Sequence, residues 1–278
     1  MPRFARSWAV FLTFARNSLI RDMTFRANFL LELASSLSWV FMNLGFYLLI
    51  FSYTPSIGAG TGWGKWEFFA FVGTGLIINS LTGMFFMTNG EEFGEMIRTG
   101  TLDFALLKPI DTQFLVSLQR VEWSGVGNLL VGIALVLVSA TYLKAPLGVL
   151  PAALYGLFVL CGVVILYSLL FSFAAMSVWL GRNTSLLDFW FYIVSFSRYP
   201  MEIYQGPLGR PIRRFFSFVL PVLVAVNVPA RVLVRPLYPQ AANDRLFALT
   251  APIAAIASFA VCRWVFVAAL RSYRSASS

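Results

Sequence analysis

The sequence of 278 residues contains no histidine and only two cysteines. Without histidine, Cys161 and Cys262 have no partners for a zinc site, and both lie inside apolar runs without CxxC spacing. We interpret them as small buried hydrophobic residues, not as a disulfide or a metal site. The missing histidine also removes the commonest general base, so neither a metalloenzyme nor a membrane-embedded hydrolase is expected. The sequence therefore predicts no catalytic residue and no metal ligand.

A phosphate-binding loop is absent from the sequence as well. Such a loop needs glycines whose backbone amides cradle an anion, followed by lysine and then serine or threonine. The single Gly-Lys pair, Gly64 and Lys65, is followed by Trp66. We therefore expect no nucleotide site and no cofactor in this chain, which on its own is not an ATPase.

Charged side chains are also scarce. They make up 12% of the sequence, roughly half their share in soluble domains, whereas 59% of the residues are hydrophobic. The 28 phenylalanines fall in long runs, which is typical of helices surrounded by lipid. The composition predicts an all-α, polytopic membrane protein. The net charge of +9 lies mainly at the ends of the apolar segments, so it indicates topology and not a nucleic-acid partner.

About six transmembrane helices are expected from the apolar segments. At roughly 1.5 Å per residue, each has the length to cross a hydrocarbon core of about 30 Å. Five of them are predicted at about 28–51, 68–87, 125–142, 150–180 and 246–270, and the sixth lies within 185–240. The whole chain, 1–278, is predicted to form one transmembrane domain.

Residues 1–26 predict an amphipathic helix that lies in the membrane surface. Between Phe4 and Ile20, apolar residues recur at helical spacing, while Arg6 and Arg16 lie elsewhere on the helical wheel. Lysine and arginine are enriched on the cytoplasmic side of membrane proteins. These arginines, together with Arg271 after the last span, predict that both termini are cytoplasmic.

Residues 185–240 allow two interpretations, because prolines interrupt an otherwise apolar stretch and exclude one straight span. One places the fifth span at about Ser185–Tyr199, followed by a re-entrant outer hairpin around Phe215–Val228. The other makes about Phe215–Val234 the fifth span and is favoured by the charge rule, because it keeps four arginines inside. These are Arg198, Arg210, Arg213 and Arg214. Residues 200–243 are thus predicted to be a proline-rich outer or re-entrant region.

Five of the twelve acidic residues gather in the loop after the second span, 89–111, which reads NGEEFGEMIRTGTLDFALLKPID. The apolar side chains of its first half share one helical face, and its glutamates project from the rest. This pattern predicts a short amphipathic helix on the inner membrane surface, ended by Gly100. A solvated loop whose charges keep it out of lipid explains the pattern equally well.

This loop resembles that of the permease subunits of type-2 ATP-binding-cassette exporters, particularly their bacterial branch. The matching residues are Gly90, Glu91, Ile97, Arg98, Gly100, Leu102, Asp103, Leu107, Lys108 and Pro109. Arg26, Asn28 and Phe29 at the head of the first span, and Tyr199 and Pro200, also resemble this branch.

The resemblance implies a mechanism. Two permease subunits, identical or related, pair in the bacterial inner membrane, and each docks a separate ATPase that binds ATP and Mg. It assigns the docking, or coupling, helix by position to Glu91, Glu92, Phe93, Glu95, Met96, Ile97 and Arg98. The loop motif that follows is Gly100, Leu102, Asp103, Lys108 and Pro109. The dimer would move an amphiphilic drug, lipid-like or glycan-related substrate outward, and the resemblance favours the re-entrant hairpin.

The alternative function is an ion-coupled secondary transporter or channel. Such proteins usually show paired repeats and acidic residues near the membrane midplane. The sequence shows neither feature. Arg263, the basic residue inside the last apolar segment, is interpreted as an anchor whose long side chain reaches the membrane surface. No substrate-binding residue is identified by the sequence.

Overall fold

The computed structural model describes residues 3–58, 62–145, 148–180, 184–234 and 242–273, and within these ranges it contains helices and no β-strand. Five helical stretches there are long and apolar enough to cross a membrane, or six if one bent pair counts as a span. The predicted all-α, polytopic fold is therefore confirmed. Four of the stretches lie close to predicted spans: α2 (Arg26–Tyr53), α7 (Val126–Tyr142), α8 (Val149–Leu180) and α12 (Ala242–Ser272).

The second span is longer than predicted. Helix α3 (Lys65–Thr82), the π-helical turn η1 (Gly83–Met87) and α4 (Thr88–Thr99) form one helical stretch of 35 residues. A π turn inserts an extra residue without ending the helix, and no proline interrupts the stretch. The helix stops at Gly100, whose φ of 73° lies in the left-handed region. The amphipathic segment after residue 87 is thus the end of the second span and not a separate surface helix.

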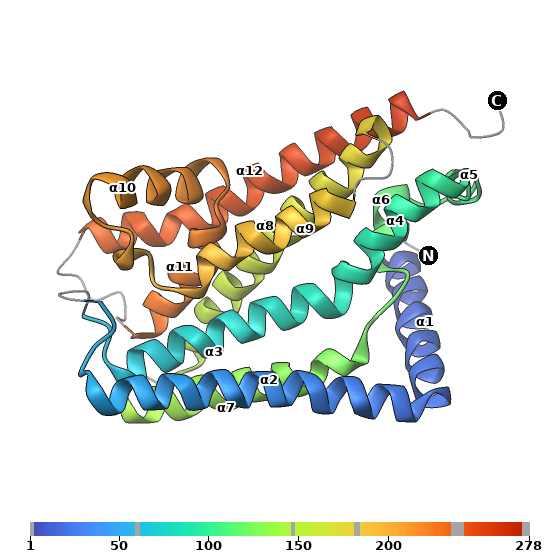
Figure 1. Cartoon of the computed structure of the whole chain (residues 1–278). Helices are drawn as coiled ribbons and strands as arrows, with labels where there is room; N and C mark the ends of the chain where they lie inside the picture. Colours follow the sequence, from blue (N-terminus) through green and yellow to red (C-terminus); the bar gives the residue numbers. More distant parts are fainter. Residues whose placement is uncertain (1–2, 59–61, 146–147, 181–183, 235–241, 274–278) are drawn as a thin grey trace.

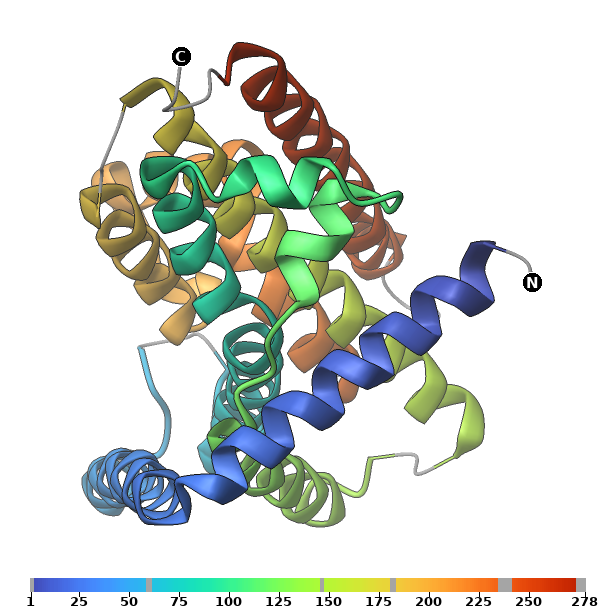
Figure 2. The same cartoon turned by 90° about the vertical axis from the view of Figure 1, so that its right-hand side faces the viewer.

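Helix α1 (Arg3–Thr24) lies crosswise to α2 at one end of the bundle (Figures 1 and 2). Two of its large apolar side chains, Trp8 and Leu12, are half exposed. This arrangement is typical of an amphipathic helix in a membrane surface, because the apolar side chains can enter lipid while the arginines stay near headgroups. We call this end of the molecule the α4 end and the opposite one the α10 end.

Helix α8 lies at the centre of the bundle, packed against α3, α4, α11 and α12. Beside it, α3 and α7 approach closely where Gly73 faces Gly132. A Cβ atom on Gly73 would lie 3.0 Å from the carbonyl oxygen of Gly132. Small residues at such contacts let helix backbones approach in the absence of a hydrophobic driving force between spans.

Residues 184–234 form a short helix followed by a bent hairpin. The elements are α9 (Thr184–Ser195), η3 (Phe196–Arg198), η4 (Met201–Ile203), α10 (Gly206–Arg214), η5 (Phe215–Val219) and α11 (Val222–Val234). Helix α11 is bent by 89° from the stretch before it. Near its start, Val226 lies against Gly75 in the middle of α3. Near its end, Leu233 shares a pocket with Pro151 at the start of α8. The hairpin therefore enters and leaves the bundle at the α10 end.

This geometry bears on the two interpretations of the proline-rich region. A straight helix over Phe215–Val234 is excluded, because the helix bends between Val219 and Val222 and the 13 residues of α11 extend only about 20 Å. Entry and exit at the α10 end favour the re-entrant hairpin, preceded by α9 and η3, but it stays a prediction because the same bend also fits one broken span. The arginines of α10 lie at the end opposite α4 (Figure 1).

Polar contacts hold the hairpin in place. The buried Asn227 accepts a hydrogen bond from the Met201 backbone N–H at 2.8 Å. Arg231 of α11 forms an ion pair with Glu202 at 2.7 Å, and the Trp63 Nε1–H donates to Glu202 at 2.9 Å. The loop before α3 and both arms of the hairpin are thereby joined. Buried polar groups paired in this way fix one arrangement, because leaving any of them unpaired is costly.

Replacing Gly162 in α8 by alanine is expected to destabilise the hairpin contact. A Cβ atom there would lie 2.4 Å from the carbonyl oxygen of Ala225 in α11, so the backbone must shift at a cost of about 1–3 kcal/mol. The matched control is Gly156→Ala on the same helix, where no neighbouring atom lies within 4 Å. The midpoint of thermal unfolding in detergent is measured for both variants. Equal midpoints for the two variants would contradict the close packing of α11 on α8.

Candidate functional site: the α4–α6 unit

The loop after the second span folds into a compact unit at the α4 end. It comprises α4, α5 (Leu102–Leu106), α6 (Thr112–Leu118) and residues 119–123, which we call the α4–α6 unit. Gly100 permits the turn between α4 and α5 because its positive φ is strained for other residues. Asp111 begins α6 by accepting a hydrogen bond from the Phe114 backbone N–H at 3.0 Å.

The apolar face of α4 packs into the protein's own core. Phe93 is fully buried and stacks on Phe266 of α12, with ring centroids 5.2 Å apart. Met96 and Ile97 are half-buried against the same core. The predicted shared face of these three residues is therefore an internal one, and it joins α4 to α12.

Glu92 and Asn89 connect α4 to residues 119–123, the segment that follows α6. Glu92 forms an ion pair with Arg120 and accepts a hydrogen bond from the Gln119 amide at 3.1 Å. Asn89 accepts from the Arg120 backbone N–H at 3.0 Å and donates to its carbonyl oxygen at 2.8 Å. Charge-assisted and paired amide contacts of this kind hold two segments in one register. Glu92 is thus engaged within the unit.

Helix α1 is bound to the same returning segment. The backbone N–H of Val121 donates to the Ser18 hydroxyl at 3.1 Å, and the Trp123 indole donates to the Ala15 carbonyl at 3.2 Å. Arg21 lies 3.5 Å from a carboxylate oxygen of Glu122. The interfacial helix, residues 119–123 and α4 therefore form one connected assembly. The sequence alone does not reveal this link, because the partners lie about a hundred residues apart.

The outer surface of the unit carries an exposed apolar tip. Phe104 is 69% exposed and Leu107 is 81% exposed, and Leu106 lies between them in sequence. We call these three residues the tip patch. Phe104 and Leu106 belong to α5, and Leu107 follows it. The helix is held from the inside by buried Leu102 and Ala105. The patch was missed by the sequence analysis, although three large apolar residues in a charged loop are a signal for it.

The other predicted site residues divide between surface and interior. Glu91, Glu95, Arg98, Lys108 and Pro109 are exposed, whereas Leu102 is buried and Asp103 is half-buried. Arg98 donates to Glu95 on its own helix, so these two charges largely offset each other. The structure brings the predicted residues into one unit. It does not place all of them on one outward face.

A groove of about 440 Å³ lies between α2, α3 and α9, away from the α4–α6 unit. Its lining is mainly apolar but includes the amides of Asn43, Asn79 and Asn128 and the side chain of Arg198. Over the described ranges, no group of three or more Cys, Asp or Glu side chains is arranged to hold a metal ion. The groove has the mixed lining of a site for an amphiphilic molecule.

Comparison with known proteins gives one match. Residues 37–277 match the family model described as ABC-2 family transporter protein. The matched residues include the α4–α6 unit and all the spans except the first residues of α2. No curated protein and no solved structure matches the chain.

Proposed function

The chain belongs to the ABC-2 family of transporter proteins, and we propose that it is a permease subunit whose separate ATPase docks on the tip patch to drive export. Subunits of this family are generally non-catalytic membrane components that work with ABC ATPase subunits. ATP and Mg are assigned to that partner and not to this chain.

The exposed tip patch is the observation that carries this proposal. Phe104 and Leu107 lie beyond the end of the second span, on α5 and directly after it, and the inner face of α5 is already buried. Exposed aromatic and aliphatic residues with a charged surround are typical of protein interaction sites. Glu91, Glu95, Arg98 and Lys108 are exposed on the same unit. The docking surface is thus proposed at α5, with the predicted coupling residues of α4 behind and beside it.

The internal contacts of the unit supply a route for movement. A displacement of α5 would move α4, which closely precedes it in the unit. Because Phe93 of α4 stacks on Phe266, α12 would move with α4. Glu92 and Asn89 pass it to residues 119–123, and from there to α1. Coupling requires contiguous packed elements of this kind. In this proposal, closure of the ATPases rocks the spans through α4 and α12 together.

We propose that the subunit lies in the inner membrane with its α4 end on the cytoplasmic side. Both termini are then cytoplasmic, and the crosswise helix α1 lies among the headgroups of the inner leaflet. The re-entrant hairpin and the arginines of α10 lie on the outer side. The hairpin would close the outer half of the path, because α11 occupies the space between α3 and α8 there.

A second permease subunit, identical or related, is proposed to pair with this one. Helix α2 has almost no buried side chains, so it is free to contact lipid or a second subunit. The groove between α2, α3 and α9 then faces the shared interior and forms part of the path. Its apolar and amide lining supports an amphiphilic drug, a lipid-like molecule or a glycan precursor as the substrate.

Co-expression with the ATPase encoded beside this chain tests the proposal. The complex is purified and its ATP hydrolysis is measured in detergent and in lipid vesicles. We expect the ATPase to co-purify with the permease and its hydrolysis to rise in lipid. A chain that retains no ATPase, and instead moves a solute in response to an ion gradient, would be a secondary transporter.

A further inference from the structure

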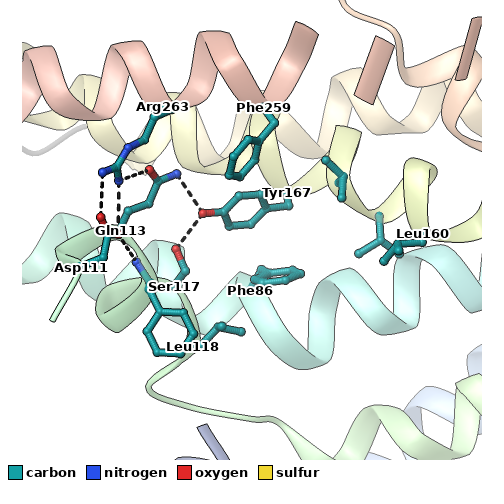
Figure 3. A pocket seen from close by; sticks show the side chains of 12 residues that line it. Phe86, Asp111, Gln113, Ser117, Leu118, Leu160, Tyr167, Phe259 and Arg263 are labelled. Atoms are coloured by element: carbon teal, nitrogen blue, oxygen red, sulfur yellow. Dashed lines mark hydrogen bonds and ion pairs between the residues drawn. The ribbon is translucent and has the colours of Figure 1, made fainter. Parts of the chain in front are cut away.

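A second pocket lies between η1, α6, α8 and α12, apart from both the tip patch and the groove at α2. Its volume is about 500 Å³, within the range of small-molecule sites. Figure 3 shows Arg263, Asp111 and Gln113 at one end and Leu160 at the other, with Phe86, Tyr167 and Phe259 between them. The pocket therefore has a polar end and a longer apolar end.

The polar end carries one positive and one negative charge side by side. Arg263 Nη2 donates to Asp111 Oδ2 at 2.7 Å, and its Nη1 donates to Asp111 Oδ1 at 3.2 Å and to Gln113 Oε1 at 2.9 Å. The side chains of Arg263 and Asp111 are 44% and 47% exposed. A guanidinium has five N–H donors, and three are used in these contacts, so two donors of Arg263, one on Nη2 and one on Nε, have no partner among the described residues.

Asp111 stays ionised in this pair. Partial burial alone would raise the pKa of its carboxyl group, but hydrogen bonds from Arg263 and from the Phe114 backbone N–H outweigh burial and lower the pKa below its usual value. The carboxylate is therefore charged at neutral pH.

The polar groups behind the Arg263–Asp111 pair already form hydrogen bonds with one another. The Gln113 amide donates to the Tyr167 hydroxyl at 3.0 Å, and the Ser117 and Tyr167 hydroxyls lie 2.9 Å apart. These groups need no ligand. What remains open to a ligand is the exposed Arg263–Asp111 pair.

The apolar end is an open trough on the lipid-facing side of α8 and α12. Leu160 is 58% exposed and Phe259 is 46% exposed, and Val163 and Val164 line the floor. From Leu160 to Tyr167 the trough follows α8 for about 10 Å. A hydrocarbon chain lying there would cover apolar side chains and end beside the charged pair.

From this geometry we infer that the pocket binds one phospholipid with a primary ammonium headgroup, from the leaflet at the α4 end. The phosphate lies on the unused donors of Arg263, the ammonium donates to Asp111, and one acyl chain fills the trough. A purely anionic headgroup fits less well, because the carboxylate of Asp111 repels it. A choline headgroup fits less well too, because its quaternary nitrogen has no N–H to donate.

The bound lipid would connect the α4–α6 unit to the last span. Asp111 begins α6, and Arg263 belongs to α12. A headgroup that contacts both side chains bridges these elements at the membrane surface. The lipid is thus expected to stiffen the link between the docking surface and the spans.

Native mass spectrometry of the full-length chain, with phosphatidylethanolamine, phosphatidylcholine or phosphatidylglycerol added, tests the inference. Wild type should retain one phosphatidylethanolamine in preference to the other two lipids. Leu160→Trp, which fills the trough, should weaken this retention roughly tenfold. The matched control is Leu157→Trp on the same helix, where the leucine is similarly exposed and lies outside the pocket.

A second variant tests the headgroup chemistry without altering the trough. Asp111→Asn keeps an acceptor for the start of α6 but removes the negative charge, so the preference should move to phosphatidylglycerol. Equal retention of the three lipids by wild type, equal loss in the two tryptophan variants, or an unchanged preference in Asp111→Asn would overturn the inference. So would a loss of dimer in Leu160→Trp with lipid retention unchanged, because a second copy would then cover the pocket.

Discussion

Replacing Phe104 and Leu107 together by serine is expected to prevent the ATPase from co-purifying with the permease. Both side chains are exposed, at 69% and 81%, so the change should leave the fold intact. Central aromatic and aliphatic anchors of an interface each contribute about 2 kcal/mol, and the loss of two raises the Kd roughly a thousandfold. Hydrolysis stimulated by the permease should fall accordingly.

Leu208→Ser provides the control for this change. Leu208 is 83% exposed on α10, at the opposite end of the molecule, so it is as accessible as Leu107 but far from the proposed interface. Its substitution should leave the complex intact. If the double variant bound the ATPase as tightly as wild type while charge reversal at Glu91 and Glu95 released it, the docking surface would lie on α4 instead.

Reversing the charge of Glu92 is expected to destabilise the permease itself. Glu92→Lys would place a second positive charge against Arg120 and break the fastening of α4 to residues 119–123. Replacing the attraction between Glu92 and Arg120 by a repulsion lowers the free energy of unfolding by roughly 2 kcal/mol or more, because the ion pair is partly shielded from water. Thermal unfolding of the permease without its ATPase measures the loss. The exchanged pair, Glu92→Lys with Arg120→Glu, should recover most of it.

Glu91→Lys is the matched control for the Glu92 variant. It changes the net charge equally, but Glu91 is exposed and no ion pair joins it to a neighbour among the described residues. Its effect on the unfolding midpoint should be small. Equal destabilisation by the two reversals, or no recovery in the exchanged pair, would show that the contact between Glu92 and Arg120 does not hold the unit together.

The long helices were predictable because lipid imposes a simple rule on them. A span must satisfy its backbone polar groups internally and present apolar side chains to lipid, so α2, α7, α8 and α12 follow directly from long, predominantly apolar runs. Helix ends were less predictable. The second span continues past Met87 because its polar residues, such as Asn89 and Glu92, find partners in the returning chain.

The hairpin shows where the rules of sequence reasoning compete. Its prolines indicated a break, which the 89° bend confirms, whereas its arginines favoured the same side as the predicted cytoplasmic loops. The contacts that hold the bent segment in place join distant residues, such as Asn227 with Met201 and Arg231 with Glu202. Local composition carries no information about such pairs.

The sequence marked the segment that folds into the α4–α6 unit, but it did not say which side chains of the unit face outward. The helical spacing of Phe93, Met96 and Ile97 correctly indicated a shared face, yet no pattern says whether that face meets the protein or a partner. Packing on Phe266, more than 150 residues away, makes it internal. The exposed side chains of α5 could be recognised only after the inward residues Leu102 and Ala105 had been placed.

Photo-crosslinking from position 107 tests the central claim most directly. A photoreactive amino acid replaces Leu107 in the permease, which is co-expressed with its ATPase and irradiated in the membrane, and Leu208 receives the same replacement in a parallel sample. The account predicts a covalent adduct with the ATPase from position 107 and none from position 208. An adduct from position 208, or none from position 107 in a complex that still hydrolyses ATP, would contradict it.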